Sequence, residues 1–100
     1  MKSYTIRINE VLYNTIRDKA KKEHRSMVGL ASYLVENALK KEFSKNPSLS
    51  EYDKKKNKLC TISLDDEHDS IVDDIILDCD YMLNRTDIFT SLLLTELKMD

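Results

Sequence analysis

The stretch SYTIRIN at residues 3–9 alternates polar and apolar side chains, and this period of two predicts a β-strand. A lone strand cannot satisfy its own backbone hydrogen bonds, so it needs a partner elsewhere in the chain. The second stretch of this kind is KLCTISL, residues 58–64. We expect the two to pair as an antiparallel two-stranded ribbon in which Thr5 lies near Thr61. A swapped pairing between two copies of the chain satisfies the same periodicity.

Two amphipathic helices are expected after the first strand. Asn9 is a suitable N-cap for a helix over residues 10–23, in which apolar side chains recur every four residues. The pattern then breaks, and Ser26 can cap a second helix that ends near Phe43. The first part of the chain therefore has the order strand–helix–helix.

The same order returns after the second strand. Asp65 can cap a helix that ends near Cys79, and Asn84 can cap a last helix. The apolar positions of the two final helices align when Ser26 is placed on Asn84. The chain thus contains an internal repeat of pattern, although few residues are identical between its halves.

Residues 44–57, SKNPSLSEYDKKKN, are polar, carry the only proline and end in a lysine run. This composition is typical of a flexible linker. The predicted fold class is mainly α with a two-stranded antiparallel ribbon, in the tandem order strand–helix–helix–linker–strand–helix–helix. We expect residues 1–43 and 58–100 to form two units that intertwine as one domain.

The period of two also assigns the faces of the ribbon. Tyr4, Ile6 and Ile8 are expected to point toward the helices, together with the apolar residues of the second strand. Leu59 falls on the outer side, which we attribute to fraying of the ribbon. The other outward positions are Ser3, Thr5, Arg7, Thr61 and Ser63. Such a polar face is common in solvated sheets, and it also fits the major groove of B-DNA, which admits a two-stranded ribbon.

The pieces YTIRIN…HRSMVGLASYLVENALKKEF and CTISLD…NRTDIFTSLLLTELK resemble the ribbon-helix-helix family of the Arc, MetJ and CopG type. The resemblance covers residues 3–43 and 58–99. In that family two strand–helix–helix units intertwine, usually as a homodimer, and the paired strands enter the major groove. The resemblance implies that this chain is a covalent pseudo-dimer with both units in tandem.

The resemblance also implies which residues touch DNA. Base contacts would come from the outward strand residues Ser3, Thr5, Arg7, Thr61 and Ser63. Phosphates would lie at the starts of the second helices, where free N–H groups and the helix dipole attract an anion. The residues at those starts are Ser26, Met27, Asn84 and Arg85. Simple helix capping accounts equally well for Ser26 and Asn84.

The second unit departs from the family pattern in its charge. Ser63 stands at the position that matches Arg7, and Asp87 lies close to the predicted phosphate clamp. Residues 1–57 carry 13 Lys and Arg against 7 Asp and Glu, whereas residues 58–100 carry 3 against 11. Carboxylates near DNA oppose binding. They either lie on helix surfaces away from DNA, or the second unit recognises a basic partner instead.

We expect a sequence-specific DNA-binding protein of the cytoplasm, a small repressor that occupies an operator in double-stranded DNA. Self-association on adjacent sites is a further expectation. The alternative is a protein-interaction module, such as an antitoxin or an anti-regulator, that uses the acidic second unit. Residues for catalysis, a metal, a cofactor or a small-molecule substrate are not apparent, and the chain has no apolar run long enough for a membrane helix.

Overall fold

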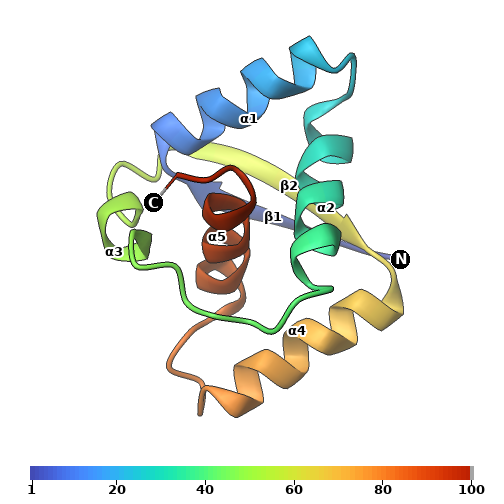
Figure 1. Ribbon diagram of the computed structural model, residues 1–100, viewed down its shortest axis with the longest axis vertical. Helices are drawn as coiled ribbons and strands as arrows, with labels where there is room; N and C mark the ends of the chain where they lie inside the picture. Colours follow the sequence, from blue (N-terminus) through green and yellow to red (C-terminus); the bar gives the residue numbers. More distant parts are fainter. Residues whose placement is uncertain (100) are drawn as a thin grey trace.

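The structure is a computed structural model that describes residues 1–99. Figure 1 shows two strands side by side, with the helices in front of them. The elements in chain order are β1 (Lys2–Ile8), α1 (Glu10–Lys22), α2 (Met27–Ala38), α3 (Leu49–Tyr52), β2 (Lys58–Leu64), α4 (Asp66–Asp78) and α5 (Arg85–Glu96). Asp100, the last residue of the predicted second unit, lies outside the described residues.

Strands β1 and β2 of the same chain pair in the predicted antiparallel register. Thr5 lies opposite Thr61, and Arg7 lies opposite Leu59. The attribution of Leu59 to a frayed end is therefore wrong, because this residue is a paired member of β2. Its side chain is nevertheless 57% exposed, since it points away from the helices.

The predicted fold class needs correction. Within residues 1–99 the chain is a small α/β domain with five helices and one two-stranded antiparallel sheet, and not a tandem of two units around a linker. Each half supplies a single strand, so the sheet and the core beneath it belong to both halves together. A fifth helix, α3, lies where the sequence predicts a linker.

Residues 44–57 are also tied to the rest of the domain, so the expectation of a flexible linker is wrong. The backbone N–H of Asn46 donates to the Ser91 hydroxyl at 2.7 Å, and this contact is buried. Further along, the Asn9 side-chain amide donates to the carbonyl of Lys54 at 2.6 Å. In both cases the partner lies 45 residues away in sequence, which is why local composition gave no sign of it.

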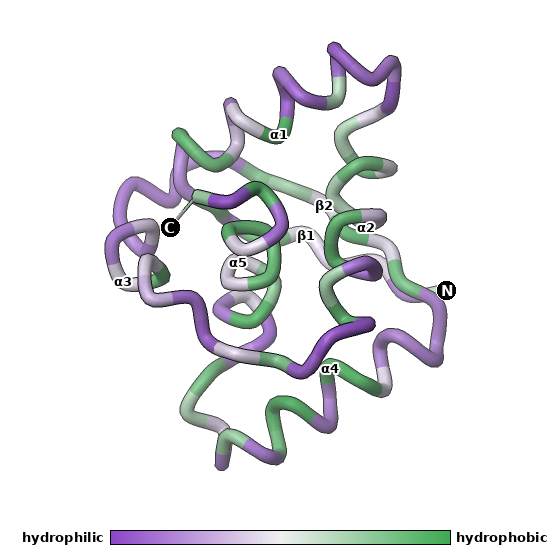
Figure 2. Tube along the Cα trace, viewed as in Figure 1, coloured by the Kyte–Doolittle hydropathy of each residue, from purple (hydrophilic) through white to green (hydrophobic). Residues whose placement is uncertain are grey.

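The core lies between the inner face of the ribbon and the helices. Ile6 and Ile8 of β1 are buried, and every residue from 88 to 94 in α5 is buried as well. Figure 2 shows α5 at the centre of the molecule with largely hydrophobic and neutral residues. Helix α4 is more peripheral, because Asp69 and Val72 are its buried residues.

Candidate nucleic-acid interface

The helices pack on the inner face of the ribbon and leave its outer face open (Figure 1). All five predicted base contacts lie on this outer face, and each is exposed or partly exposed. They form three cross-strand pairs along the ribbon once Leu59 is included: Ser3–Ser63, Thr5–Thr61 and Arg7–Leu59. Leu59 is the member that sequence reasoning missed, although its odd-numbered position already placed it on this side.

Two of the three pairs are hydroxyl pairs. The Ser3 and Ser63 Oγ atoms lie 2.8 Å apart, and the Thr5 and Thr61 Oγ1 atoms lie 3.1 Å apart. A hydroxyl group has one proton to donate and two lone pairs that accept. Within each pair one hydroxyl donates to the other, which leaves one proton and further lone pairs free. These two pairs can therefore donate to or accept from a ligand on the outer face.

The third pair gives the ribbon a distinct end. Arg7 is exposed and forms no ion pair within residues 1–99, so its five N–H donors are available to a ligand. The exposed aliphatic side chain of Leu59 lies opposite it. One end of the outer face thus carries the hydroxyl groups of Ser3 and Ser63. The other end carries the positive charge of Arg7 and the apolar side chain of Leu59.

The start of α2 is an open helix N-terminus. The Ser26 hydroxyl accepts a hydrogen bond from the Gly29 N–H at 3.0 Å, and the first turn contains no acidic residue. Met27 is partly exposed beside this cap. Arg25 precedes the helix, and its guanidinium lies 4.8 Å from the centre of the Tyr33 ring and 3.6 Å from the Glu23 carboxylate. The helix dipole favours an anion here, although Glu23 already shares the adjacent cation.

At the start of α5, acidic residues already bind the groups that could contact a phosphate. The Asn84 side chain accepts from the Asp87 N–H at 2.8 Å, and the Asp87 carboxylate accepts from the Asn84 N–H at 3.2 Å. The Arg85 guanidinium hydrogen-bonds to Asp73 and lies 3.6 Å from the carboxylate of Asp69. Arg85 therefore already has charged partners within the protein, whereas Met27 at the matching position of α2 is uncharged. Asn84 caps its helix as Ser26 does.

Arg85 belongs to a network that joins β1 to α4 and α5. Its guanidinium stacks 4.6 Å from the centre of the Tyr4 ring, and the Tyr4 hydroxyl donates to Asp69 at 2.5 Å. The Asp69 side chain is only 4% exposed. Burial by itself raises the pKa of this carboxyl, but the Tyr4 hydrogen bond and the neighbouring cations outweigh it and lower the pKa. The same hydrogen bond raises the pKa of Tyr4.

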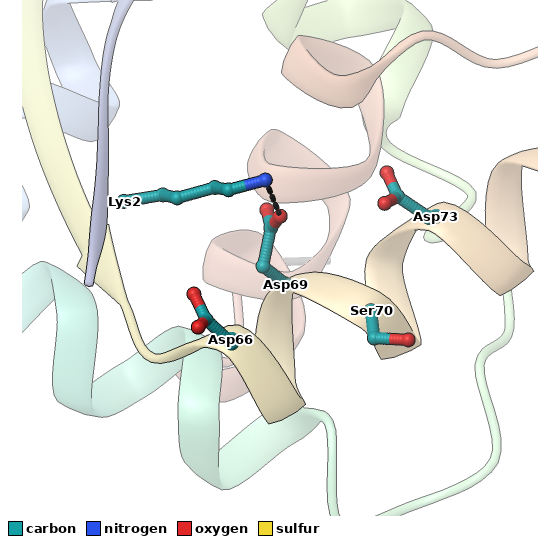
Figure 3. A pocket seen from close by; sticks show the side chains of 5 residues that line it. All are labelled: Lys2, Asp66, Asp69, Ser70 and Asp73. Atoms are coloured by element: carbon teal, nitrogen blue, oxygen red, sulfur yellow. Dashed lines mark ion pairs between the residues drawn. The ribbon is translucent and has the colours of Figure 1, made fainter.

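A shallow hollow of about 220 Å³ opens beside this network. Figure 3 shows Lys2 reaching across it to Asp69, with a distance of 3.4 Å between the Lys2 Nζ and the carboxylate. Asp66, Ser70 and Asp73 of α4 form the rest of the lining. No group of three His, Cys, Asp or Glu side chains within residues 1–99 is arranged to hold a metal ion. Lys2, Asp69 and Asp73 of this lining take part in the ion pairs described above.

From this network we expect the free energy of unfolding to fall at both low and high pH. Asp69 has a lowered pKa, so its contribution is present above about pH 4 and is lost as the pH falls through its folded value. Tyr4 has a raised pKa, so its contribution is present below about pH 10 and is lost as the pH rises through its folded value. Urea unfolding across pH measures both losses. Tyr4→Phe is expected to reduce the alkaline loss, and an unchanged alkaline limb would contradict this assignment.

Comparisons with known proteins do not extend this description. Neither the scan of protein-family models nor the searches of curated proteins and solved structures finds a match to the chain. The helices within residues 1–99 all lack the length and apolar character needed to cross a membrane. The function must therefore be inferred from the residues of the ribbon and its surroundings.

Proposed function

We propose that the chain is a sequence-specific DNA-binding protein that inserts the β1–β2 ribbon into the major groove. The observation that carries the proposal is the open outer face of the ribbon, which presents Arg7, two hydroxyl pairs and one exposed leucine in a row. As a small repressor in the cytoplasm, the protein would occupy an operator and exclude polymerase. The proposal includes no catalytic step and no cofactor.

The chemistry of the outer face matches what base edges offer. An arginine side chain can bind the O6 and N7 atoms of guanine through two parallel hydrogen bonds. Serine and threonine hydroxyls can pair with several bases, and threonine methyl groups can contact thymine methyl groups. The outer face from Ser3 to Arg7 is about 13 Å long at the usual rise of a strand, which corresponds to about four base pairs.

The starts of α2 and α5 differ in how well they can bind a DNA phosphate. The start of α2, at Ser26 and Met27, has no carboxylate in its first turn, and the adjacent Arg25 pairs with Glu23 at 3.6 Å. The start of α5 has Asp87 in its capping box, and Arg85 is bound by Asp69 and Asp73. Phosphate contacts at Asn84 and Arg85 therefore compete with internal partners. We expect one chain to read an asymmetric site.

Amide chemical shifts of the labelled protein, recorded during titration with a DNA duplex at low salt, test this proposal. The largest changes are expected at residues 3–7 and 59–63, with smaller changes at the start of α2. The affinity is expected to fall steeply with salt, because cations released from the phosphates supply much of the binding free energy. Saturating shift changes confined to α4, or none at all, would refute the proposal.

Leu59 is expected to contribute base selectivity through a thymine methyl group. Its exposed side chain lies opposite Arg7, and apolar contact with the C5 methyl is a recognised way of reading thymine. Replacing the contacted thymine by deoxyuridine removes only that methyl and is expected to weaken wild-type binding about 3- to 5-fold, close to the loss of one buried methyl group. Leu59→Ala is expected to abolish this difference.

The control for this prediction is Val11→Ala, which truncates an exposed side chain of α1 instead. That variant should discriminate thymine from deoxyuridine as the wild type does. If no thymine in the bound sequence shows a penalty that depends on Leu59, the residue does not read a methyl group.

A protein-interaction module is the second candidate, and the surface of α4 favours it. The helix carries six acidic residues, and Leu77 near its end is 54% exposed. A basic protein surface or peptide fits such a helix better than DNA does. Shift changes confined to α4 on titration with a basic peptide, together with no response to DNA, would favour this candidate.

A further inference from the structure

We infer that Lys54 and Lys55 bind phosphates of the DNA backbone beyond the Arg7 end of the ribbon. The phosphate contacts would then lie mostly on one side of the bases that the ribbon reads. The inference rests on the proposed function and adds a phosphate-binding segment outside the strands and the helix starts. Lysine is suited to this task, because its ammonium group is a compact charge that binds phosphate without strict geometry.

The backbone holds these two lysines next to the end of the ribbon. The Lys54 carbonyl accepts from the Asn9 side chain at 2.6 Å, and the Lys55 carbonyl accepts from the Glu10 N–H at 3.2 Å. Asn9 directly follows Ile8, the last residue of β1. The chain then enters β2 at Lys58, which lies opposite Ile8. The position of the lysine run relative to Arg7 is thus fixed through backbone atoms.

The side chains of Lys54 and Lys55 are exposed and form no ion pair within residues 1–99. Lys56 differs, because its ammonium group lies 2.6 Å from the Asp53 carboxylate. Glu10 is the exposed acidic residue of the adjoining turn. Together with Arg7, the two free lysines leave this end of the ribbon with a surplus of positive charge.

The opposite end of the ribbon has the reverse character. Lys2 is paired with Asp69 at 3.4 Å, and the next residues after β2 are the exposed Asp65 and Asp66. A duplex that lies along the ribbon carries one negative charge per about 1.7 Å and continues past both ends. It meets free lysines beyond Arg7 and carboxylates beyond Ser3. The backbone contacts must therefore concentrate on the Arg7 side.

The test compares Lys54→Gln/Lys55→Gln with Lys40→Gln/Lys41→Gln, which removes two exposed lysines just after the end of α2. Affinity for the duplex selected by the wild type is measured from about 50 to 200 mM salt, where each lost phosphate contact lowers the salt slope by about 0.9. The first variant is expected to lose about two contacts. As salt rises across this range, the affinity of the variant therefore falls about tenfold less than the affinity of the wild type. The control is expected to keep the wild-type slope.

The selected motif separates this inference from the proposed function. Lys54→Gln/Lys55→Gln is expected to select the same motif as the wild type, because phosphates carry no sequence information directly. Equal slopes for the variant, its control and the wild type would overturn the inference while leaving the DNA-binding proposal intact. A wild-type chain that selects no motif would overturn both. Since both lysines are anchored through their carbonyls, the variant is expected to keep the wild-type unfolding curve.

Discussion

Arg7→Ala is expected to abolish the preference for the guanine that Arg7 contacts, while leaving weaker, salt-dependent binding to DNA. Arg7 is the only cation on the outer face of the ribbon within residues 1–99, and it has no internal ion pair there. A bidentate contact with guanine contributes about 1–3 kcal/mol of discrimination, which is roughly 5- to 150-fold in relative affinity. The measurement is competition between the selected duplex and a duplex with that guanine replaced.

Arg17→Ala is the matched control, because Arg17 lies on α1 and makes only an exposed ion pair with Asp18 at 3.4 Å. It removes the same charge from the protein but none from the ribbon. Both variants are expected to lose some affinity at low salt through the lower positive charge. Equal preference for the guanine in wild type and Arg7→Ala would exclude Arg7 as the residue that reads it.

Asp69→Ala is expected to lower the free energy of unfolding by about 3 kcal/mol, the largest effect on stability anticipated for a polar residue here. The Asp69 side chain is 4% exposed and is the shared partner of Lys2, Tyr4 and Arg85. Its removal takes away the carboxylate 3.6 Å from the Arg85 Nη1 atom, which is buried without a hydrogen bond. Urea unfolding followed by circular dichroism measures the loss.

Asp73→Ala serves as the control, because Asp73 contacts the same guanidinium but is 53% exposed. It is expected to cost about 1 kcal/mol or less. The double variant Asp69→Leu/Arg85→Met removes both charges and is expected to recover most of the stability lost in Asp69→Ala. If Asp69→Ala is no less stable than Asp73→Ala, the network does not join the sheet to α4 and α5 as described.

The part of the fold that follows from local pattern could be predicted from the sequence. Alternation in the two strands predicted their inner and outer faces, and the observed register, with Thr5 opposite Thr61, keeps both inner faces toward the helices. N-caps at Asn9 and Ser26 marked helix starts correctly, because a capping side chain acts on a backbone N–H only two or three residues away. These are short-range effects.

The errors concern interactions between residues far apart in the chain. The segment 44–57 looked like a linker because its composition does not reveal that its backbone groups bond to Asn9, ahead of α1, and to Ser91 in α5. Arg85 looked available for phosphate because nothing in its neighbourhood reveals that Asp69 and Asp73 face it from α4. The outward position of Leu59 was attributed to fraying of the ribbon. An exposed leucine on the outer face could instead have indicated a residue that contacts a ligand.

The candidate site was therefore partly accessible from the sequence. Its outward strand residues follow from alternation alone, which required no knowledge of the helices. The difference in charge between the two ends of the ribbon does not follow from alternation. It depends on which lysine and arginine side chains the fold leaves without an ion pair. The structure pairs Lys2 and Arg85 with carboxylates and leaves Arg7, Lys54 and Lys55 without an ion pair within residues 1–99.

Selection of bound sequences from a random duplex library at low salt tests whether the ribbon reads DNA sequence. We expect enrichment of one motif with a core of about four base pairs and a guanine toward one end. The motif should be asymmetric, because the two ends of the ribbon differ in chemistry. Absence of enrichment would show that the ribbon does not read DNA sequence, and a palindrome within the footprint of a single chain would show that it does not read an asymmetric site.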